Sequence, residues 1–339
     1  MTIGTVHEAA AEERPAAKDA LRPSRWHRVA RVAALEETWT KATAPTALVV
    51  AFVVFSLVAP NFATWHNVNA MLADAAIPVL LAVGMTFAVM LAGIDLSMAA
   101  TLALASVVFG LGYQAGWGLF GSCLLAIGVG VLVGAANGFF VGRVRIPDMI
   151  VTLGTMGVVM GIGLVASRGI PMPIADDTLR IIARESLGPL RWNFVIVLVI
   201  GALLHIVLTH TAIGTHLLAV GDSMDASKAM GIRVPRVKLV GYMIGGALAG
   251  ISAIFLILYV GSTQPAVNTD YVMKAVAATV LGGTSLFGGR ATVWGPMLGA
   301  VLLTVVQTGL TMVGVEAFFE PAVVGVIVLA AATLMRGRK

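Results

Sequence analysis

Few side chains in this 339-residue chain are of the types that carry out chemistry or bind metals. The sequence contains no Gly-x-x-x-x-Gly-Lys-Ser/Thr loop, so it lacks the usual backbone cradle for the phosphates of ATP. His205, His210 and His216 do not have the spacing of metal ligands, and the single Cys123 excludes a disulfide framework. We therefore expect no catalytic residue, no metal, no cofactor and no enzymatic activity.

Two carboxylates in apolar surroundings are the exception. Asp74 and Asp95 each lie near an end of a long apolar segment, where an ionisable residue is a candidate for function by default. Ser97 follows Asp95 at the start of the next segment and is typical of a helix N-cap. Capping and structural hydrogen bonding is the favoured role at Asp95, with contact to a substrate or gate as the alternative. For Asp74 we favour a water-exposed cap over proton coupling.

A short polar stretch, residues 221–235, interrupts the apolar part of the chain. It is compatible with a short helix that begins near Asp225, whose charge suits the positive end of a helix dipole. Gly231 is placed to end this helix, and Pro235 to prevent its continuation into the next apolar segment. An ordinary connector is the alternative, although a connector needs neither a polar helix nor a glycine at this spacing. The stretch predicts a docking site for a partner outside the membrane.

The overall composition places these residues in a membrane protein. Hydrophobic residues make up 58% of the chain and charged residues 12%, and the mean hydropathy is +0.94, which leaves too little polar surface for a water-soluble globule. We predict an all-α polytopic membrane protein of about ten transmembrane helices, each needing about 20 apolar residues. The segments expected to span are 45–59, 70–92, 97–113, 119–141, 148–166, 193–208, 237–260, 275–286, 295–314 and 321–335.

Glycines mark where these helices are expected to break or to approach one another closely. The segment 275–286 is too short to cross alone, so it is either a half-helix or joined to its neighbours through the glycine-rich turn 282–289. Other glycines recur at a four-residue spacing that is typical of helix packing, with helix sliding during transport as the alternative. These are Gly130, Gly134, Gly138 and Gly142, and the pairs Gly157/Gly161, Gly241/Gly245, Gly246/Gly250 and Gly295/Gly299.

Charge asymmetry predicts the orientation of the chain. If the N-terminus is inside the cell, 17 of the 22 Lys and Arg residues fall on the cytoplasmic side, so both termini are predicted to be cytoplasmic. Segments two to five then begin outside and segments seven to ten inside, which suggests an inverted repeat like those of alternating-access transporters. Residues 1–44 are predicted to be a disordered, basic cytoplasmic tail or to lie on lipid headgroups, with no nucleic acid as partner. Residues 45–336 form the predicted transmembrane domain, with a cytoplasmic loop over 209–236.

The loop 167–192 falls on the outer side and carries charges of both signs. Its residues 176–187 are compatible with an amphipathic surface helix. Together with Gln264, Asn268 and Asp270, the loop offers a mixed-charge face for a soluble binding protein, where such charges set register and association rate. A solvated loop without a partner is the alternative.

Four blocks of sequence, in order along the chain, resemble a known family. They are 93–97 (Gly-Ile-Asp-Leu-Ser), 147–156 (Pro-Asp-Met-Ile-Val-Thr-Leu-Gly-Thr-Met), the polar stretch 221–235, and 280–290 (Val-Leu-Gly-Gly-Thr-Ser-Leu-Phe-Gly-Gly-Arg). From about Asn61 to the C-terminus, the chain resembles the membrane-spanning permease subunits of ribose-type bacterial ABC sugar importers. It resembles the branched-chain amino-acid permeases more distantly.

The resemblance implies roles for three groups of residues. The polar stretch is similar to the family's Glu-Ala-Ala loop, whose short helix docks into a cleft on the ATPase subunit; here Asp225-Ala226-Ser227 replaces Glu-Ala-Ala. The implied coupling residues are Asp225, Ala226, Ser227, Gly231, Ile232 and Pro235. The motif turn is Gly93, Ile94, Asp95, Leu96 and Ser97, beside departures from the family pattern at Ala92, Ala99 and Ala100. Candidate pathway or gate residues are Thr152, Thr155, Gly282, Gly283, Thr284, Ser285 and Gln307, the last of which either lines a pore or bonds between helices.

The function implied is that of the permease subunit of a binding-protein-dependent importer in the bacterial inner membrane. Its implied partners are cytoplasmic ATPase subunits that hydrolyse the ATP, a periplasmic sugar-binding protein, membrane lipids and a second copy of the chain. A pentose, hexose or polyol is the expected cargo, because few charges in the segments would bind an ionic substrate. The alternative is an ion-coupled secondary transporter of a small polar solute, which would need a charged site deep in a span. A membrane scaffold fits the packing glycines but not the separate docking helix.

Overall fold

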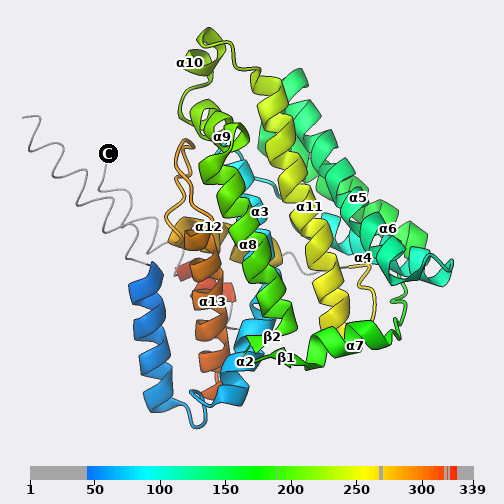
Figure 1. The fold of residues 1–339 in the computed structure, drawn as a ribbon, viewed down its shortest axis with the longest axis vertical. Helices are drawn as coiled ribbons and strands as arrows, with labels where there is room; N and C mark the ends of the chain where they lie inside the picture. Colours follow the sequence, from blue (N-terminus) through cyan, green and yellow to red (C-terminus); the bar gives the residue numbers. More distant parts are fainter. Residues whose placement is uncertain (1–43, 189, 267–269, 317–318, 320, 327–339) are drawn as a thin grey trace, which may run out of the picture. The chain divides into compact units, whose positions relative to one another are not determined.

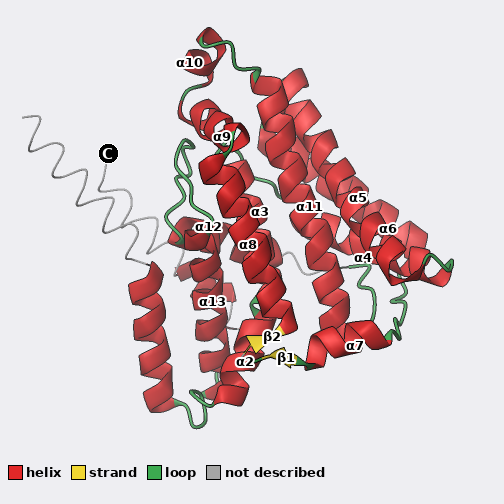
Figure 2. Ribbon diagram, in the orientation of Figure 1, coloured by secondary structure: helices red, strands yellow, loops and turns green. Residues whose placement is uncertain are grey.

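The computed structural model of the chain describes residues 44–326, apart from 189, 267–269, 317–318 and 320. The predicted tail therefore lies outside the described residues except for Ala44, as does most of the predicted segment 321–335. Helices dominate the described part, where the only strands are the antiparallel pair β1 (Ser186–Leu187) and β2 (Leu190–Arg191), as Figure 2 shows. The prediction of a helical protein is confirmed for this part of the chain.

Each predicted segment overlaps a helix, although the last does so only through helical residues 321–326. The helices, most of them labelled in Figure 1, are Ala44–Val58, α2 (Trp65–Asp74), α3 (Ala76–Val89), α4 (Met98–Gln114), α5 (Gly118–Phe139) with its π-helical extension η2 (Phe140–Val144), α6 (Asp148–Ser167), α7 (Asp177–Arg184), α8 (Trp192–His210), α9 (Ala212–Asp222), α10 (Met224–Ala229), α11 (Val234–Val260), α12 (Asp270–Leu281) and α13 (Trp294–Met312).

The described helices make this a polytopic membrane protein. Within the described residues, five helices are long and apolar enough to cross a membrane, namely α5 with η2, α6, α8, α11 and α13. The pair α2 and α3 gives a sixth crossing if it is one bent span, and Ala44–Val58 and α4 are shorter apolar helices. The count of ten spans, the inverted repeat and the orientation stay predictions.

A bend of 40° separates α2 from α3, where the sequence predicts one continuous segment. Pro78 explains the bend, because a proline has no N–H to donate to the carbonyl four residues earlier, which here belongs to Asp74. The predicted segment 70–92 is thus corrected to two helices that meet at Ala75.

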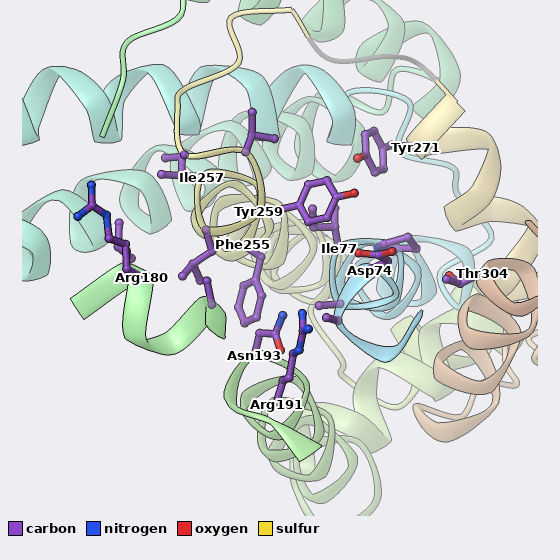
Figure 3. Close-up of a pocket in the computed structure, with 18 of the residues that line it drawn as sticks. Asp74, Ile77, Arg180, Arg191, Asn193, Phe255, Ile257, Tyr259, Tyr271 and Thr304 are labelled. Atoms are coloured by element: carbon purple, nitrogen blue, oxygen red, sulfur yellow. The ribbon is translucent and has the colours of Figure 1, made fainter. Parts of the chain in front are cut away.

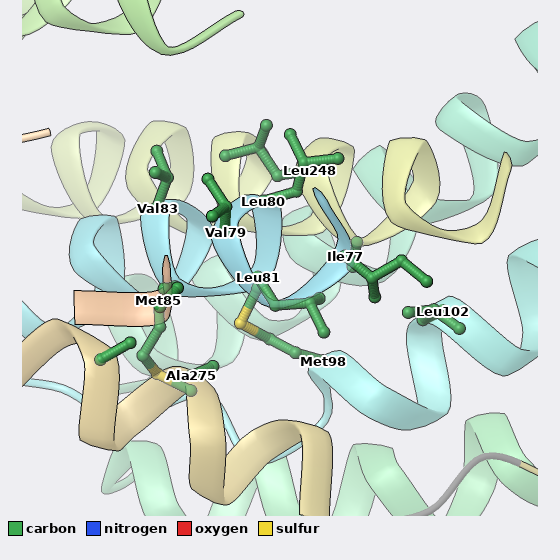
Figure 4. Close-up of a cluster of buried hydrophobic side chains, with 14 of the residues drawn as sticks. Ile77, Val79, Leu80, Leu81, Val83, Met85, Met98, Leu102, Leu248 and Ala275 are labelled. Carbon is green, nitrogen blue, oxygen red and sulfur yellow. The ribbon is translucent and has the colours of Figure 1, made fainter. Parts of the chain in front are cut away.

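Helix α3 is the core of the described bundle. Every residue of α3 except Pro78 is buried, and α8, α11, α12 and α13 pack against it. Figure 4 shows its side chains, such as Leu80 and Met85, beside Met98 of α4 and Leu248 of α11. A helix that is apolar on all sides is expected in such a position. The bundle therefore surrounds one central helix whose two ends reach different sites.

Glycines allow close approach in most of the predicted places. A Cβ on Gly130 or Gly134 would strike a carbonyl oxygen of α11, and a Cβ on Gly138 would lie 2.6 Å from a Cα of α11. The packing role predicted for this ladder is confirmed at these positions. Gly157 and Gly161 are different, because a Cβ there would meet no atom within 4 Å, so this pair does not pack within the described chain.

Two ends of the bundle are distinguished by the helices that they carry. In Figure 1, α9, α10 and the start of α11 lie together at what we term the α10 end. The other terminus of α11 lies beside α7, where the N–H of Ile174 bonds to the carbonyl of Gly261, and we term this the α7 end.

Candidate functional site

Helix α10 is the short helix predicted in the polar stretch, and Gly231 ends it. Gly231 has a φ of +82° and donates its N–H to the carbonyl of Lys228 at 2.9 Å. Ile232 donates to the carbonyl of Ser227 at 3.0 Å. These two bonds form a Schellman motif, which favours glycine at its left-handed position. The helix and its end are confirmed where the sequence predicts them.

The start of α10 is capped, and most of its surface is exposed. The hydroxyl of Ser223 accepts a hydrogen bond from the N–H of Ala226 at 3.2 Å. Exposed Asp225 pairs with Lys228 at 2.9 Å, and this hydrogen bond and charge lower the pKa of the Asp225 carboxyl. Ser227 is the exception, because it is fully buried and its hydroxyl has no partner among the described residues. The exposed residues are therefore Asp225, Ala226, Lys228 and Ala229, followed by Met230, which is apolar.

Pro235 lies in the first turn of α11, which begins at Val234 and not at the predicted 237. Proline is tolerated there because the first N–H groups of a helix have no acceptor within it. The expected role of Pro235 is therefore corrected: it lies inside the next helix, while the break is made by Gly231.

The last turn of α9 and Ser223, which we together term the connector to α10, lie at the α10 end, and two distant segments pack against Gly221 in this turn. The N–H of Gly289 donates to the carbonyl of Met90, just after α3, at 3.0 Å. A Cβ on Gly221, in the last turn of α9, would strike that same carbonyl, and one on Gly288 would lie 2.6 Å from the carbonyl of Gly221. Gly288 and Gly289 have φ of +86° and +74°. Three segments that are far apart in sequence thus meet without room for a side chain.

The motif turn 93–97 is a buried hydrogen-bonded turn. Asp95 is 3% exposed, and its carboxylate accepts from the N–H of Ser97 at 2.9 Å and from the Ser97 hydroxyl at 2.6 Å. Asn137 donates to the Ser97 hydroxyl at 2.8 Å. The favoured structural role of Asp95 fits this geometry. Ser97 occupies the N-cap position of α4 as predicted, but its side chain makes no bond to the first turn of α4 and bonds to Asp95 instead.

The start of α6 is hydrogen-bonded to the motif turn 93–97. The N–H of Ile94 donates to the Asp148 carboxylate at 2.6 Å, and the hydroxyl of Thr152 donates to the Ile94 carbonyl at 3.2 Å. Thr152 is fully buried, whereas Thr155 is half-buried one turn farther along α6. The turn therefore joins α4, α5 and α6 at the α10 end.

The glycine-rich segment after α12 closes the same end of the bundle. A Cβ on Gly282 would strike the backbone at the start of α13, and Gly283 has a φ of +81°. Thr284 is fully buried with no partner for its hydroxyl among the described residues, and Ser285 donates its N–H to the Arg290 carbonyl at 3.0 Å. With only 12 residues, α12 fits the predicted half-helix.

A cavity of about 950 Å³ opens at the α7 end, and Figure 3 shows part of its wall. Of the predicted pathway residues only Gln307 lines it, where its side-chain oxygen accepts from Lys274 at 2.8 Å. Gln307 thus both lines a cavity and bonds between helices. The polar and charged lining residues are Asp74, Asp176, Arg180, Arg191, Asn193, Tyr259, Tyr271, Lys274, Thr304, Gln307, Thr308 and Thr311.

The outer loop forms part of this cavity wall. Helix α7 is the predicted surface helix, and the carboxylate of Asp176 caps it by accepting from the N–H of Leu179 at 3.1 Å. The same residue accepts from the Tyr113 hydroxyl at 3.1 Å, which ties the loop to α4. Gln264 is also tied to α4, because its N–H donates to the Ser106 hydroxyl at 3.1 Å. Asn268 lies outside the described residues.

The family model described as branched-chain amino acid transport system / permease component matches residues 67–332. The autoinducer 2 import system permease protein LsrC of Yersinia pseudotuberculosis serotype O:3 (strain YPIII) is 30% identical over 292 residues, 85% of this chain and 82% of that protein. The protein of the same name from Yersinia enterocolitica is 31% identical, with 85% and 80% covered, and that from Photorhabdus luminescens is 29% identical, with 85% and 87% covered. No solved structure matches.

These matches confirm the family resemblance carried by the four sequence blocks. They also confirm that the chain is a transporter subunit and not an enzyme, since a partner ATPase hydrolyses the ATP. An importer of this kind implies an ATPase and a binding protein as partners. The chain belongs to the branched-chain amino acid transport system permease family and is a multi-pass ABC-importer permease of the bacterial inner membrane.

Proposed function

We propose that the chain forms the transmembrane pathway of an importer for a small, sugar-like polar solute that a binding protein delivers. The observation that carries this proposal is the exposed, doubly capped helix α10, whose connector is clasped against the end of α3. A helix held in this way receives movement from a docked ATPase and passes it into the bundle. The proposed docking segment comprises Asp225, Ala226, Ser227, Gly231, Ile232 and Pro235, in which Asp225, Ala226 and Gly231 are exposed and Ser227 is buried beneath them.

The coupling route runs along the central helix. ATP binding draws the two ATPase subunits together and displaces α10 with its connector. Because Gly221 packs against Met90, the displacement reaches the end of α3. The opposite end of α3, at Ile77 and Pro78, lines the cavity at the α7 end. Movement of α3 therefore changes access to that cavity without any chemistry by the permease.

A sugar-like cargo is supported by the relatives and by the cavity lining. The relatives are named for import of autoinducer 2, a furanosyl, sugar-like molecule. The hydroxyls of Thr304 and Thr308 and the amide of Gln307 line the cavity, and such groups bond well to a neutral polyhydroxy solute. The proposed cargo class contains autoinducer 2 and pentoses, hexoses and polyols of similar size.

The proposed assembly has the α10 end in the cytoplasm and the α7 end in the periplasm. Both termini are cytoplasmic, the chain has ten spans in two inverted halves, 1–44 is a cytoplasmic tail, and 209–236 is the coupling loop. Two copies of the chain pair with two ATPase subunits, and the binding protein docks at the α7 end. The turn 93–97 and the residues Thr152, Thr155, Gly282, Gly283, Thr284 and Ser285 form the inner gate.

Reconstituted transport tests this function. Proteoliposomes that contain the chain and its partner ATPase, supplied with the binding protein, should accumulate labelled autoinducer 2 or ribose only when ATP is present on the ATPase side. Removal of the catalytic glutamate of the ATPase should abolish accumulation. Uptake that persists without ATP hydrolysis and collapses with an ionophore would instead support the ion-coupled transporter.

A further inference from the structure

The cavity at the α7 end extends between the ends of several helices, from α2 and α7 to α13. Its inner wall includes Ile77 and Thr304, which are 6% and 7% exposed. Along α3 from this point, Leu81 and Met85 are fully buried and belong to the apolar core. The cavity is therefore a vestibule that is closed toward the α10 end.

The helix bend supplies acceptor groups to this vestibule. Pro78 leaves the carbonyl of Asp74 without its usual helical donor, and both residues line the cavity. Asp74 itself is exposed there. Broken membrane helices place backbone and side-chain polar groups at solute sites in many transporters. The bend thus puts a carboxylate and a backbone acceptor on one wall.

Arg191 brings the opposite charge from the start of α8. Its side chain and that of Asp74 line the same cavity, as Figure 3 shows. In the described part of the chain, however, no ion pair or hydrogen bond joins these two side chains, and neither has another hydrogen-bond partner. A ligand that accepts from a guanidinium and donates to a carboxylate would satisfy both groups, as a pair of sugar hydroxyls does.

Aromatic rings and a second pair of polar residues complete the wall. Tyr259, which is 67% exposed, and Tyr271 lie beside Asp74 in Figure 3, and Asn193 reaches in from α8. Lys274 and Gln307, joined at 2.8 Å, lie on α12 and α13. Exposed aromatic faces pack on the apolar C–H faces of sugar rings. The charged lining residues number two acids and three bases, so no large excess favours an ion.

We propose that this vestibule binds a cyclic polyhydroxy solute within a single copy of the chain. Asp74 and Arg191 bond to its hydroxyls, and Tyr259 packs against its ring. The class of ligand rests on the proposed function. The location rests only on the cavity and on the residues that line it.

Protection of an introduced cysteine tests the site. The full chain, purified in detergent without partners, carries Cys123→Ser together with Thr308→Cys, which places a thiol on the vestibule wall. Autoinducer 2 and D-ribose should each slow thiol modification at this position, whereas L-leucine should not. Ser186→Cys, exposed at the same end but outside the lining, is the control that should react equally with and without sugar.

Matched variants identify the binding groups. Arg191→Gln should raise the sugar concentration for half-maximal protection about tenfold, as expected from the loss of a charge-assisted hydrogen bond. Arg168→Gln, an exposed arginine outside the lining, should leave it unchanged. Tyr259→Leu keeps an exposed site apolar and should also weaken protection. No protection by either sugar, or protection by L-leucine alone, would overturn this inference.

The two proposals fail in different ways. ATP-driven uptake without cysteine protection would remove the vestibule site and leave the importer function standing. Cysteine protection without ATP-driven uptake would remove the importer function and leave the vestibule site standing.

Discussion

At the scale of single residues, Ser227 is the position in α10 where a polar side chain is buried. Its hydroxyl is fully buried without a partner among the described residues, and such a group costs about 1–3 kcal/mol. We expect Ser227→Ala, which restores the alanine of the family's Glu-Ala-Ala pattern, to leave the thermal unfolding temperature unchanged or higher and to preserve uptake.

Ser223→Ala is the matched control for this change. It removes the hydroxyl that accepts from Ala226, and loss of such a cap costs about 1 kcal/mol. In one thermal-unfolding series we therefore expect Ser223→Ala to lower the unfolding temperature and Ser227→Ala not to lower it. A drop for Ser227→Ala as large as that for Ser223→Ala would mean that the Ser227 hydroxyl has a partner.

Gly231 is the second residue on which α10 depends. Its left-handed conformation costs an alanine about 1–2 kcal/mol, so Gly231→Ala should fray the helix and reduce co-purification of the partner ATPase. Gly261, at the end of α11, has a similar left-handed φ of +76°, so an alanine there should suffer a similar strain at the opposite end of the bundle. Gly261→Ala should keep ATPase co-purification; an equal loss in both variants would show a general folding defect and contradict the docking role.

At the scale of elements, the sequence predicts helices well where one continuous apolar run forms each helix. The bounds of α6 and α13 differ from the predicted segments by at most two residues. Pro147 and Arg168 border α6, and Gly314, with a φ of +90°, closely follows α13. The bend before α3 is not visible in this way, since Ala75 and Pro78 are themselves apolar and do not interrupt the run. Apolar periodicity reports burial, and it is insensitive to a lost backbone hydrogen bond.

The vestibule escapes prediction for a different reason. Its polar residues come from α2, α7, the start of α8, and the ends of α11, α12 and α13, each contributing one or a few side chains. None of these groups forms a motif along the chain. Gln307 is predicted because it is a polar residue within an apolar segment, and Asp74 together with Pro78 is the remaining signal for a broken helix beside a site.

The clasp of the α9–α10 connector is an element-scale feature with a testable consequence. Gly221→Ala places a methyl group against the Met90 carbonyl and the Gly289 N–H, so the connector must separate from the end of α3. We expect ATPase binding to persist, because α10 itself is unchanged, while ATP-driven uptake falls at least tenfold. Uptake and ATP hydrolysis measured on one reconstituted sample check this separation.

Gly157→Ala is the control for that variant. A Cβ at Gly157 meets no atom within 4 Å, so the same substitution in a membrane helix should leave coupling intact within one copy of the chain. Retained uptake by Gly221→Ala would show that α10 drives transport by a route other than α3.

At the scale of the whole molecule, the proposed coupling requires α10 and the vestibule to face opposite sides of the membrane. Lys228 on α10 and Arg180 on α7 are suitable reporters, because each is a half-exposed cation paired with an aspartate three residues earlier in its helix. Their side chains are 55% and 62% exposed. Under the proposed orientation, cysteines at these positions differ mainly in the side of the membrane that they occupy.

In a Cys123→Ser background, Arg180→Cys should react with a membrane-impermeant maleimide in intact cells, and Lys228→Cys only in inverted vesicles. This outcome follows from the positive-inside distribution of the Lys and Arg residues. Labelling of both cysteines from the same side would mean that the chain crosses the membrane an even number of times, or not at all, between α7 and α10. An ATPase at α10 would then share a compartment with the vestibule, and the proposed transfer of movement across the bilayer through α3 would be excluded.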